Sequence, residues 1–366
     1  MTTLKKAGGM ALALMLVLGA CDSLQGDLDQ AKKDLALRER QLDVLKAGGS
    51  DHSNYNEGET DPAKKGWEGW FAQYDKIMSD IAKYKTGGTL SDGTVVAVNT
   101  PIDTLLLGDD VFDRFDNGDP PGSENAITIT SDNMWQILLT VSNNTVNASI
   151  AGNTVGDMQY MADQILSLGV NSLTIKRAIV NAGANDLANA GSTQSLEVGA
   201  ATASVIANKV GRLVAALMGS ANINKVAVLT PVYRGNLNSN DQMYLRGGLD
   251  QTSNPAYGST PPDFVKDSWD SIKNTSSDVF ENDGQSLTGK GYNFIRAMIT
   301  TIVNDSSMAK AMPKDKGAIH LASALNPQQH GYDYDRIKKS GRDYNQARGR
   351  STQLATRTRG DTHQIG

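Results

Sequence analysis

Four short polar segments carry the residue types from which a hydrolytic or binding site could be built. In chain order they are Gly108-Asp109-Asp110, Gly152-Asn153, Gly183-Ala184-Asn185-Asp186 and Asp283-Gly284-Gln285-Ser286. Carboxylates can transfer protons, hold a cation or accept hydrogen bonds from hydroxyls, while a glycine amide or an asparagine side chain can donate to an oxyanion. Each segment follows an apolar run, so we expect the four to meet where the strands of a parallel sheet end.

The sequence around these segments alternates between short apolar runs and amphipathic stretches. Strands are expected at residues 104–107, 146–150, 178–181, 226–229 and 278–280, and helices at 67–84, 131–140, 155–168, 196–218, 263–273 and 290–303. Strands that alternate with helices indicate a parallel sheet covered by helices on both faces. The composition, 39% hydrophobic with 36 glycines and 10 prolines, is typical of such an α/β domain.

In order and spacing, the four segments resemble the sequence blocks of the SGNH (GDSL) hydrolase family across about residues 102–303. Gly183–Asp186 matches the family's G-x-N-D in full, and Gly291-Tyr292 matches the pair that opens the last family helix. The resemblance implies a flavodoxin-like three-layer α/β sandwich with a parallel sheet. It also implies that Gly152 and Asn185 are the oxyanion donors of an esterase-type hydrolase.

Two positions depart from the family pattern. Asp110 stands where the family has its nucleophilic serine, and Ser286 stands where it has its histidine, three residues after Asp283. A carboxylate that accepted an acyl group would become a reactive anhydride, and its charge opposes formation of an oxyanion nearby. An alcohol cannot act as a base near neutral pH, and losing one triad member already removes most of the rate acceleration. We therefore do not expect the ordinary serine-esterase mechanism.

The residues that remain leave several functions open. If Asp110 and Asp283 meet in a cleft, they could share a proton, act as an acid/base pair, hold a weakly bound cation or bind sugar hydroxyls. Each could equally do no more than accept a backbone amide. His320 faintly echoes the lost histidine block, although its distance from the preceding acid is too long. We predict a catalytically degenerate binding or scaffolding protein without a cofactor or dedicated metal site; the alternative is a hydrolase that uses Asp110 and Asp283, or His320.

The N-terminus predicts export and a membrane anchor. Two lysines precede an apolar run at residues 10–18, and Leu18-Gly19-Ala20-Cys21 resembles a bacterial lipobox. We expect residues 1–20 to be a signal peptide and Cys21, the only cysteine, to be lipidated. This predicts a location in the bacterial cell envelope, on the periplasmic or extracellular face of a membrane. The alternative is an ordinary signal peptide followed by a chance cysteine.

Leucines recur in steps of four and three from Leu24 to Leu45, which predicts a coiled-coil stalk over residues 21–46. The stalk would be either a homo-oligomer or a monomeric helix. Residues 47–63 read as a linker, and residues 64–101 as an amphipathic helix and lead-in whose stripe of Trp70, Tyr74, Ile77 and Ile81 packs on the next domain.

The SGNH-like domain is expected at residues 102–305 and a polar basic tail at residues 306–366. Residues 318–325 could form one further element, and residues 328–366 are expected to be largely disordered. The tail could contact anionic lipids or polymers, or could simply be solvated. The net charge of −5 argues against nucleic acid as a partner. Active relatives of the family often process acyl groups on envelope glycans, so analogy suggests a glycan as the ligand.

Overall fold

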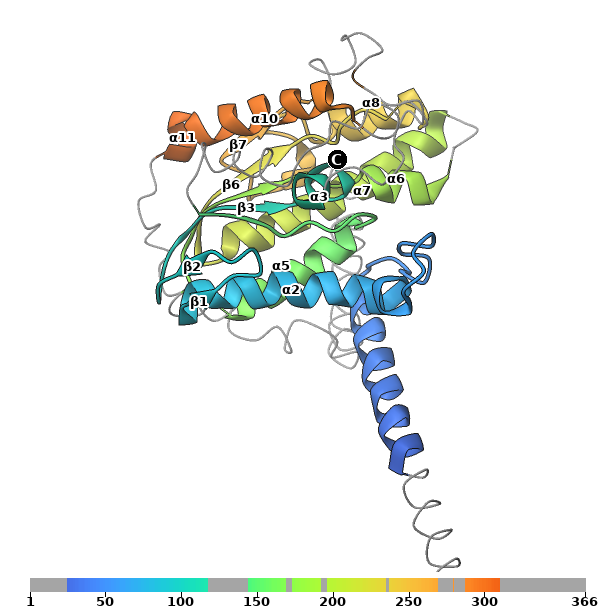
Figure 1. Ribbon diagram of the computed structural model, residues 1–366. Helices are drawn as coiled ribbons and strands as arrows, with labels where there is room; N and C mark the ends of the chain where they lie inside the picture. The colour runs from blue at the N-terminus through green and yellow to red at the C-terminus, as the bar shows by residue number, and fades with distance from the viewer. Residues whose placement is uncertain are drawn as a thin grey trace, which may run out of the picture. The chain divides into compact units, whose positions relative to one another are not determined.

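The structure is a computed structural model that describes residues 25–117, 144–168, 173–191, 196–234, 237–268, 279 and 287–309. Its centre is a five-stranded parallel sheet of order β4-β3-β5-β6-β7 (Figure 1). The strands are β3 (Ile102–Leu107), β4 (Thr145–Asn147), β5 (Ile175–Val180), β6 (Ile223–Leu229) and β7 (Phe264–Lys266). The chain lays β4 on one side of β3 and then reverses to build the other side, which is the flavodoxin-like order.

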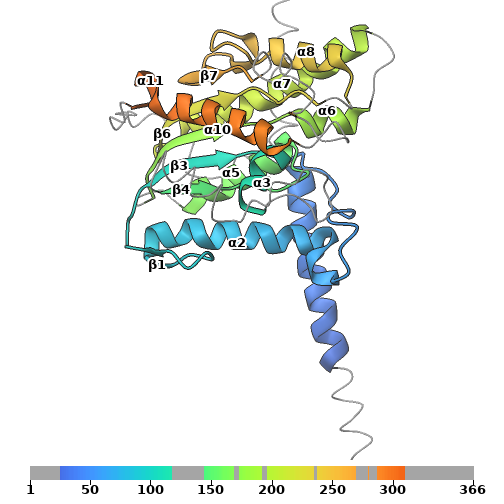
Figure 2. The ribbon, with the colours of Figure 1, turned by 45° about the horizontal axis from the view of Figure 1, so that its top comes forward.

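Both faces of the sheet are buried because apolar side chains follow one another along its strands. Leu105 and Leu107 enter one core and Leu106 enters the other, as the alternation of side chains along a strand requires. The first core contains side chains of α5 (Val155–Leu168) and α7 (Leu196–Gly219). The second contains side chains of α3 (Asp110–Asn117), α10 (Gly289–Asn304) and α11 (Ser306–Ala309). Figure 2 shows the helices on either side of the sheet, and the predicted three-layer α/β sandwich is confirmed.

Shorter elements complete the described part of the chain. They are η1 (Pro62–Lys64), the antiparallel hairpin β1 (Gly88–Thr89) and β2 (Val95–Val96), α6 (Ala184–Ala190), α8 (Ser239–Gly247) and η2 (Pro255–Tyr257). The side chain of Asn238 caps α8 by accepting the amides of Asn240 and Asp241. Sequence patterns did not predict α6 or α8, because both are short and polar.

One predicted helix was wrong. Residues 263–273 were expected to be helical, but Phe264–Lys266 pair with β6 as the fifth strand. The hydrogen bonds along an exposed sheet edge outweigh a weak local preference for helix. The strand predicted at 278–280 is described only at Val279, which lies outside the sheet, and the helix predicted at 131–140 falls outside the described residues.

Helix α2 (Gly66–Thr86) is part of the core even though it precedes the first strand of the sheet. Trp70, Tyr74 and Ile81 are buried in the same apolar cluster as α5 and α7, which confirms the predicted packing face. The ring of Trp70 is fully buried, and its Nε1 donates to Oδ1 of Asn153 at 2.9 Å. The α/β domain therefore depends on residues that lie well before residue 102.

The connection between the first helix, residues 25–46, and α2 is attached to the domain by one carboxylate. Asp157, fully buried at the start of α5, accepts the amide of Ser50 at 3.1 Å and its hydroxyl at 2.8 Å. Nε2 of the buried His52 lies 3.0 Å from the same carboxylate. This part of the predicted linker is thus held by buried polar contacts, which its polar composition did not predict.

Among the described residues, one helix segment, Val198–Gly219 in α7, has the length and composition of a membrane span. Val210, Leu213 and Leu217 of this helix are fully buried in the core beneath the sheet. Packing against the sheet accounts for the apolar character of α7.

Gly211 of α7 marks the closest approach between that helix and η2. A Cβ built on Gly211 would lie 1.7 Å from the carbonyl oxygen of Ala256. We expect Gly211→Ala to lower the free energy of unfolding by about 1–3 kcal/mol, because backbone would have to move. Gly219→Ala is the matched control, since nothing lies within 4 Å of its Cβ position. Urea unfolding of both variants tests this; equal stabilities would contradict the packing.

Candidate functional site

The carboxylate of Asp110 lies at the carboxyl end of β3 and reaches the loop after β4. Its Oδ1 accepts the backbone N–H of Gly152 at 2.9 Å. Gly152 has φ of +80°, a conformation that favours glycine and that turns its amide toward the site. The N–H that the family resemblance assigns to an oxyanion is therefore bound to the protein's own carboxylate.

The guanidinium of Arg234 joins the other polar groups of the site. Its Nη2 lies 3.2 Å from Oδ2 of Asp109 and 3.0 Å from Oδ2 of Asp110. Its Nη1 donates to Oδ1 of Asn185 at 2.8 Å. Arg234 is 5% exposed and Asp109 is 1% exposed, so this is a buried ion-pair network rather than a surface contact.

Asn185 completes the network, with one hydrogen bond at each end of its side-chain amide. Its Nδ2, the second predicted oxyanion donor, donates to the carbonyl oxygen of Asn153 at 3.1 Å, while its Oδ1 accepts from Arg234. Both predicted donors thus have protein acceptors. Asp110 brings no hydroxyl, and its charge is balanced by a cation instead of being available to a substrate. The arrangement fixes charged groups in position, but it presents no hydroxyl nucleophile at position 110, and the Gly152 amide is already bound to Asp110.

Arg234 is held in place by a side chain of α8. Its backbone N–H donates to Oε1 of Gln242 at 2.7 Å, and Nε2 of Gln242 donates back to the carbonyl oxygen of Arg234 at 2.8 Å. The sequence analysis did not identify either residue. A usable signal was present, since Arg234 follows β6 by five residues and so lies at the same sheet edge as the other three segments.

Burial and the surrounding charges shift two pKa values in the network. Burial raises the pKa of Asp109 to about 7; Arg234 opposes this rise and Asp110 adds to it. Burial alone would lower the pKa of Arg234, but Asp109 and Asp110 outweigh it and raise that pKa above its ordinary value. The cation is therefore permanent, whereas Asp109 titrates near neutral pH.

We expect this titration to make stability depend on pH. The pKa of Asp109 is about 7 in the folded chain and 3.8 without the fold, so the folded state keeps the proton over that interval. Stability should fall as pH rises from about 4 to about 7 and then level off. Between about pH 6 and about pH 8 the loss should be about 1 kcal/mol. Urea unfolding of the parent and of Asp109→Asn measures it; parallel pH profiles of the two proteins would contradict the assignment.

Of the site residues predicted from sequence, the structure brings together Asp110, Gly152 and Asn185. Asp283 and Ser286 lie outside the described residues, as does His320 of the alternative mechanism. The structure thus places part of the predicted constellation and adds Asp109 and Arg234 to it.

His52 forms a second polar cluster, with Ser50 and Asp157. The residue types are those of a hydrolytic triad, but the geometry is different. The same atom, Nε2 of His52, lies 3.0 Å from Asp157 and 3.5 Å from Oγ of Ser50. The Ser50 hydroxyl donates directly to Asp157. A triad needs the two histidine nitrogens to serve serine and aspartate separately, so this cluster attaches the connection to α5 and does not activate a nucleophile.

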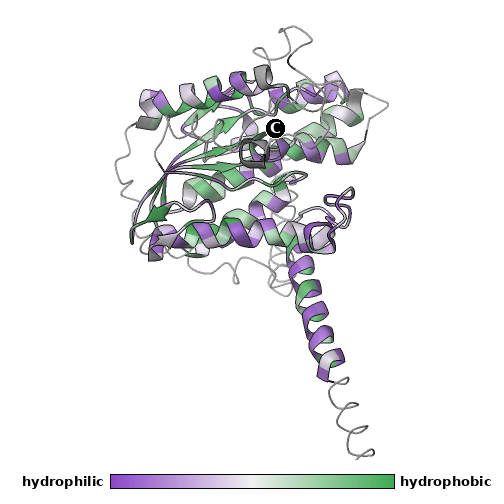
Figure 3. Ribbon diagram, viewed as in Figure 1, coloured by the Kyte–Doolittle hydropathy of each residue, from purple (hydrophilic) through white to green (hydrophobic). Residues whose placement is uncertain are grey.

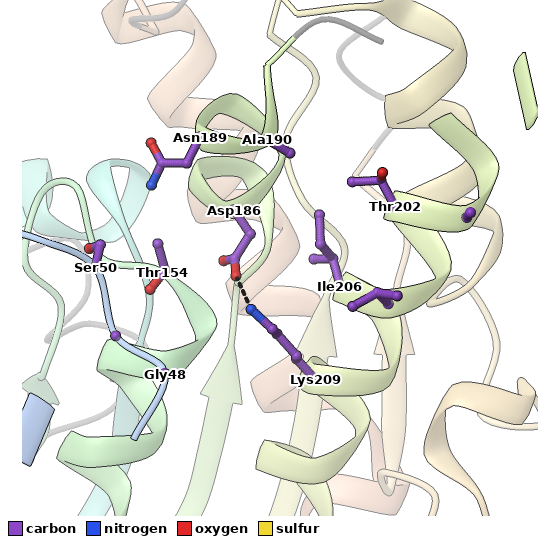
Figure 4. Close-up of a pocket in the computed structure, with 12 residues that line it drawn as sticks. Gly48, Ser50, Thr154, Asp186, Asn189, Ala190, Thr202, Ile206 and Lys209 are labelled. Atoms are coloured by element: carbon purple, nitrogen blue, oxygen red, sulfur yellow. Dashed lines mark ion pairs between the residues drawn. The ribbon is translucent and has the colours of Figure 1, made fainter. Parts of the chain in front are cut away.

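A cavity of about 530 Å³ is lined by residues of α6 and α7, by Thr154 and by residues 48–50 of the connecting segment (Figure 4). In it Lys209 of α7 extends toward Asp186 of α6, with 3.6 Å between Nζ and Oδ1. Burial raises the pKa of Asp186, while the Val155 amide and Lys209 lower it. The described residues contain no group of three or more histidine, cysteine or acidic side chains suited to a metal ion.

No protein-family model matches the chain, and no curated protein matches it. Several solved structures are similar to it, three of which follow. A Bacteroides fragilis protein named as a candidate acylhydrolase shares 14% identity, with 68% of this chain and 100% of that chain covered and a TM-score of 0.39. A Geobacillus acetyl-xylooligosaccharide esterase variant shares 16%, covering 56% and 94%, with a TM-score of 0.35. An acetyl xylan esterase shares 18%, covering 54% and 98%, with a TM-score of 0.32.

The domain has the flavodoxin-like three-layer α/β fold that the sequence resemblance to SGNH hydrolases implies. The order of its sheet and the meeting of Asp110, Gly152 and Asn185 at one edge are what the family resemblance implies. The SGNH-like domain differs from the family pattern at its centre, where a carboxylate and a guanidinium lie beside the two donors.

Proposed function

We propose that this protein is a catalytically degenerate SGNH-like protein that binds a ligand or holds a partner in the bacterial cell envelope. The observation that carries the proposal is the internal use of both oxyanion donors. Gly152 donates to Asp110, and Asn185 donates to Asn153. Binding a developing oxyanion to the Gly152 amide would require that amide to release the Asp110 carboxylate, whose negative charge would then lie beside the oxyanion.

The proposed location follows from the N-terminal sequence. A lipidated Cys21 would anchor the chain to a membrane, with the domain held away from the surface by the helix at residues 25–46. Cys21 lies outside the described residues. A glycan of the envelope is the proposed ligand class, by analogy with hydrolases of this family.

The helix at residues 25–46 supports a scaffolding role. Leu37 and Val44 pack on the domain, whereas a second stripe is exposed. Leu28, Leu35 and Leu42 are 50%, 59% and 51% exposed and seven residues apart. Figure 3 shows apolar bands along a helix that is otherwise largely hydrophilic. We propose that a second copy of the chain covers this stripe as a coiled coil.

Sedimentation of the detergent-solubilised full chain tests the oligomer. Replacing Leu28, Leu35 and Leu42 together with serine should convert it to monomers. The control is Val95→Ser with Val98→Ser, two apolar residues of the β1–β2 region that are even more exposed than the leucines. A parent that sediments as a monomer at every concentration overturns the oligomer.

Assays on the purified full-length protein test the loss of catalysis. We expect no hydrolysis of nitrophenyl acetate or acetylated sugars above the solvent rate, and no change with Asp110→Ala. The combined Asp110→Ser and Ser286→His variant restores the serine and histidine of the family pattern. Hydrolysis by this variant, where the parent has none, supports the proposal. Parent activity that Asp110→Ala abolishes would instead establish a hydrolase that uses this carboxylate.

A further inference from the structure

A second cavity, of about 380 Å³, lies where the first helix, the connecting segment and the start of α2 meet. Two aromatic rings, Tyr55 and Trp67, form part of its wall, together with Leu37 of the first helix. Two carboxylates, Glu57 and Glu68, stand at the same wall. None of these residues belongs to the SGNH-like site, and all precede the first strand of the sheet.

Trp67 is the outer end of a stack of aromatic rings. Its ring stacks on Phe71 at 5.6 Å and meets His52 and Trp70 edge to face at 5.1 and 6.2 Å. Its Nε1 donates to Asp51 at 3.1 Å. Trp67 is half-buried, while Trp70 and Phe71 behind it are buried. The part of the ring that faces the cavity is therefore held rigidly, so a ligand would find it preorganised.

The polar groups of this cavity are hydrogen-bond acceptors and one cation. Glu57 and Glu68 are exposed, so their carboxylates retain acceptor capacity for a ligand. Lys65 adds a donor. It is the N-cap residue of α2, and its side chain does not cap the helix amides. Rigid aromatic surface beside carboxylate acceptors suits a molecule with apolar C–H faces and a rim of hydroxyls.

Tyr55 adds a hydroxyl donor to this cavity. Burial, with smaller contributions from the charges of Asp113 and Asp110, raises the pKa of Tyr55 to about 12. The hydroxyl of Tyr55 therefore keeps its proton at neutral pH.

We propose that this cavity binds one sugar unit of an oligosaccharide, with Trp67 and Tyr55 against the C–H face and Glu57 and Glu68 accepting from hydroxyls. The inference rests on the proposed role as a binding protein, and it names the ligand class and its place. The cavity beside Asp186 is less suited to a sugar ring, because its described lining is aliphatic and polar without an aromatic side chain.

Calorimetric titration of the full-length protein with a β-1,4-linked N-acetylglucosamine tetramer tests the site. Saturable binding is expected, and Trp67→Leu should weaken it at least about tenfold, equal to about 1.4 kcal/mol. Because Trp67→Leu also alters the aromatic stack, Glu57→Gln provides a second variant at an exposed residue. It should weaken binding about threefold to tenfold while leaving the circular dichroism melt unchanged.

Two controls locate the effect. Glu39→Gln, an exposed carboxylate on the first helix away from the cavity, should bind as the parent does. Asn189→Ala changes the cavity beside Asp186 and should also leave binding unchanged. Loss of binding in Asn189→Ala, with Trp67→Leu and Glu57→Gln unaffected, would contradict the location of the sugar in the cavity of Tyr55 and Trp67. Absence of saturable binding to the parent would contradict the sugar-binding proposal itself. The titration does not involve ester cleavage, so it can fail or succeed whether or not the esterase assays show activity.

Discussion

Arg234→Ala is expected to lower the free energy of unfolding by about 1–3 kcal/mol at neutral pH, because Asp109 and Asn185 lose a buried hydrogen-bond donor and Asp109 takes up a proton in its place. Asp109 is 1% exposed and would lose its guanidinium partner, and Asn185 would lose the donor to its Oδ1. Urea unfolding at neutral pH measures the change. Arg212→Ala, which removes an exposed arginine of α7, is the matched control and should fall within about 0.5 kcal/mol of the parent.

A double-mutant cycle separates charge from packing at this site. If the cost of Arg234→Ala comes from the partner that Asp109 loses, then Asp109→Asn should remove a large part of that cost. The coupling energy between the two substitutions should be about 1–3 kcal/mol. A cost for Arg234→Ala no greater than that of Arg212→Ala would show that the network contributes nothing to stability.

Trp70→Ala is expected to destabilise the protein by about 3–5 kcal/mol, because it empties the largest fully buried side-chain site in the core. It also removes the Nε1 donor to Asn153, whose carbonyl oxygen accepts from Asn185. The loop that carries Gly152 should therefore lose a support as well. Thermal unfolding measures the first effect, and protection of the Gly152 amide from hydrogen exchange measures the second.

Trp70→Phe is the matched variant for this prediction. It keeps an aromatic ring against His52, which stacks on Trp70 at 4.5 Å, but it cannot donate to Asn153. We expect a smaller loss of about 1–3 kcal/mol, because a buried acceptor is left without its donor. If Trp70→Phe and Trp70→Ala were equally unstable, packing of the ring would contribute little.

The parts of the fold that follow from hydrophobic periodicity could be predicted from the sequence. The bounds of α5 were predicted to the residue, and those of α7 and α10 to within one residue, since each has a long amphipathic pattern. The short edge strand β7 could not be predicted, because three residues carry no period. Its structure depends on pairing with β6.

Site residues could be predicted where their place follows from the end of a strand. They could not be predicted where their place depends on a contact with a distant side chain. Asp110, Gly152 and Asn185 lie three to five residues after β3, β4 and β5, so the parallel sheet brings them to one edge. Arg234 reaches the same edge from a loop whose path depends on Gln242, and no local pattern records that contact. The contacts of Ser50 and His52 with the buried Asp157 could not be predicted either, since polar residues near glycines usually indicate exposed loops.

The contact between Asp110 and Arg234 makes the effects of substitutions at these two positions depend on each other. A serine at position 110 would free the Gly152 amide and leave Arg234 with Asp109 as its remaining carboxylate partner in the described site. A change at position 234 would instead remove the shared guanidinium from both carboxylates. The charge that position 110 can carry therefore depends on which side chain position 234 supplies.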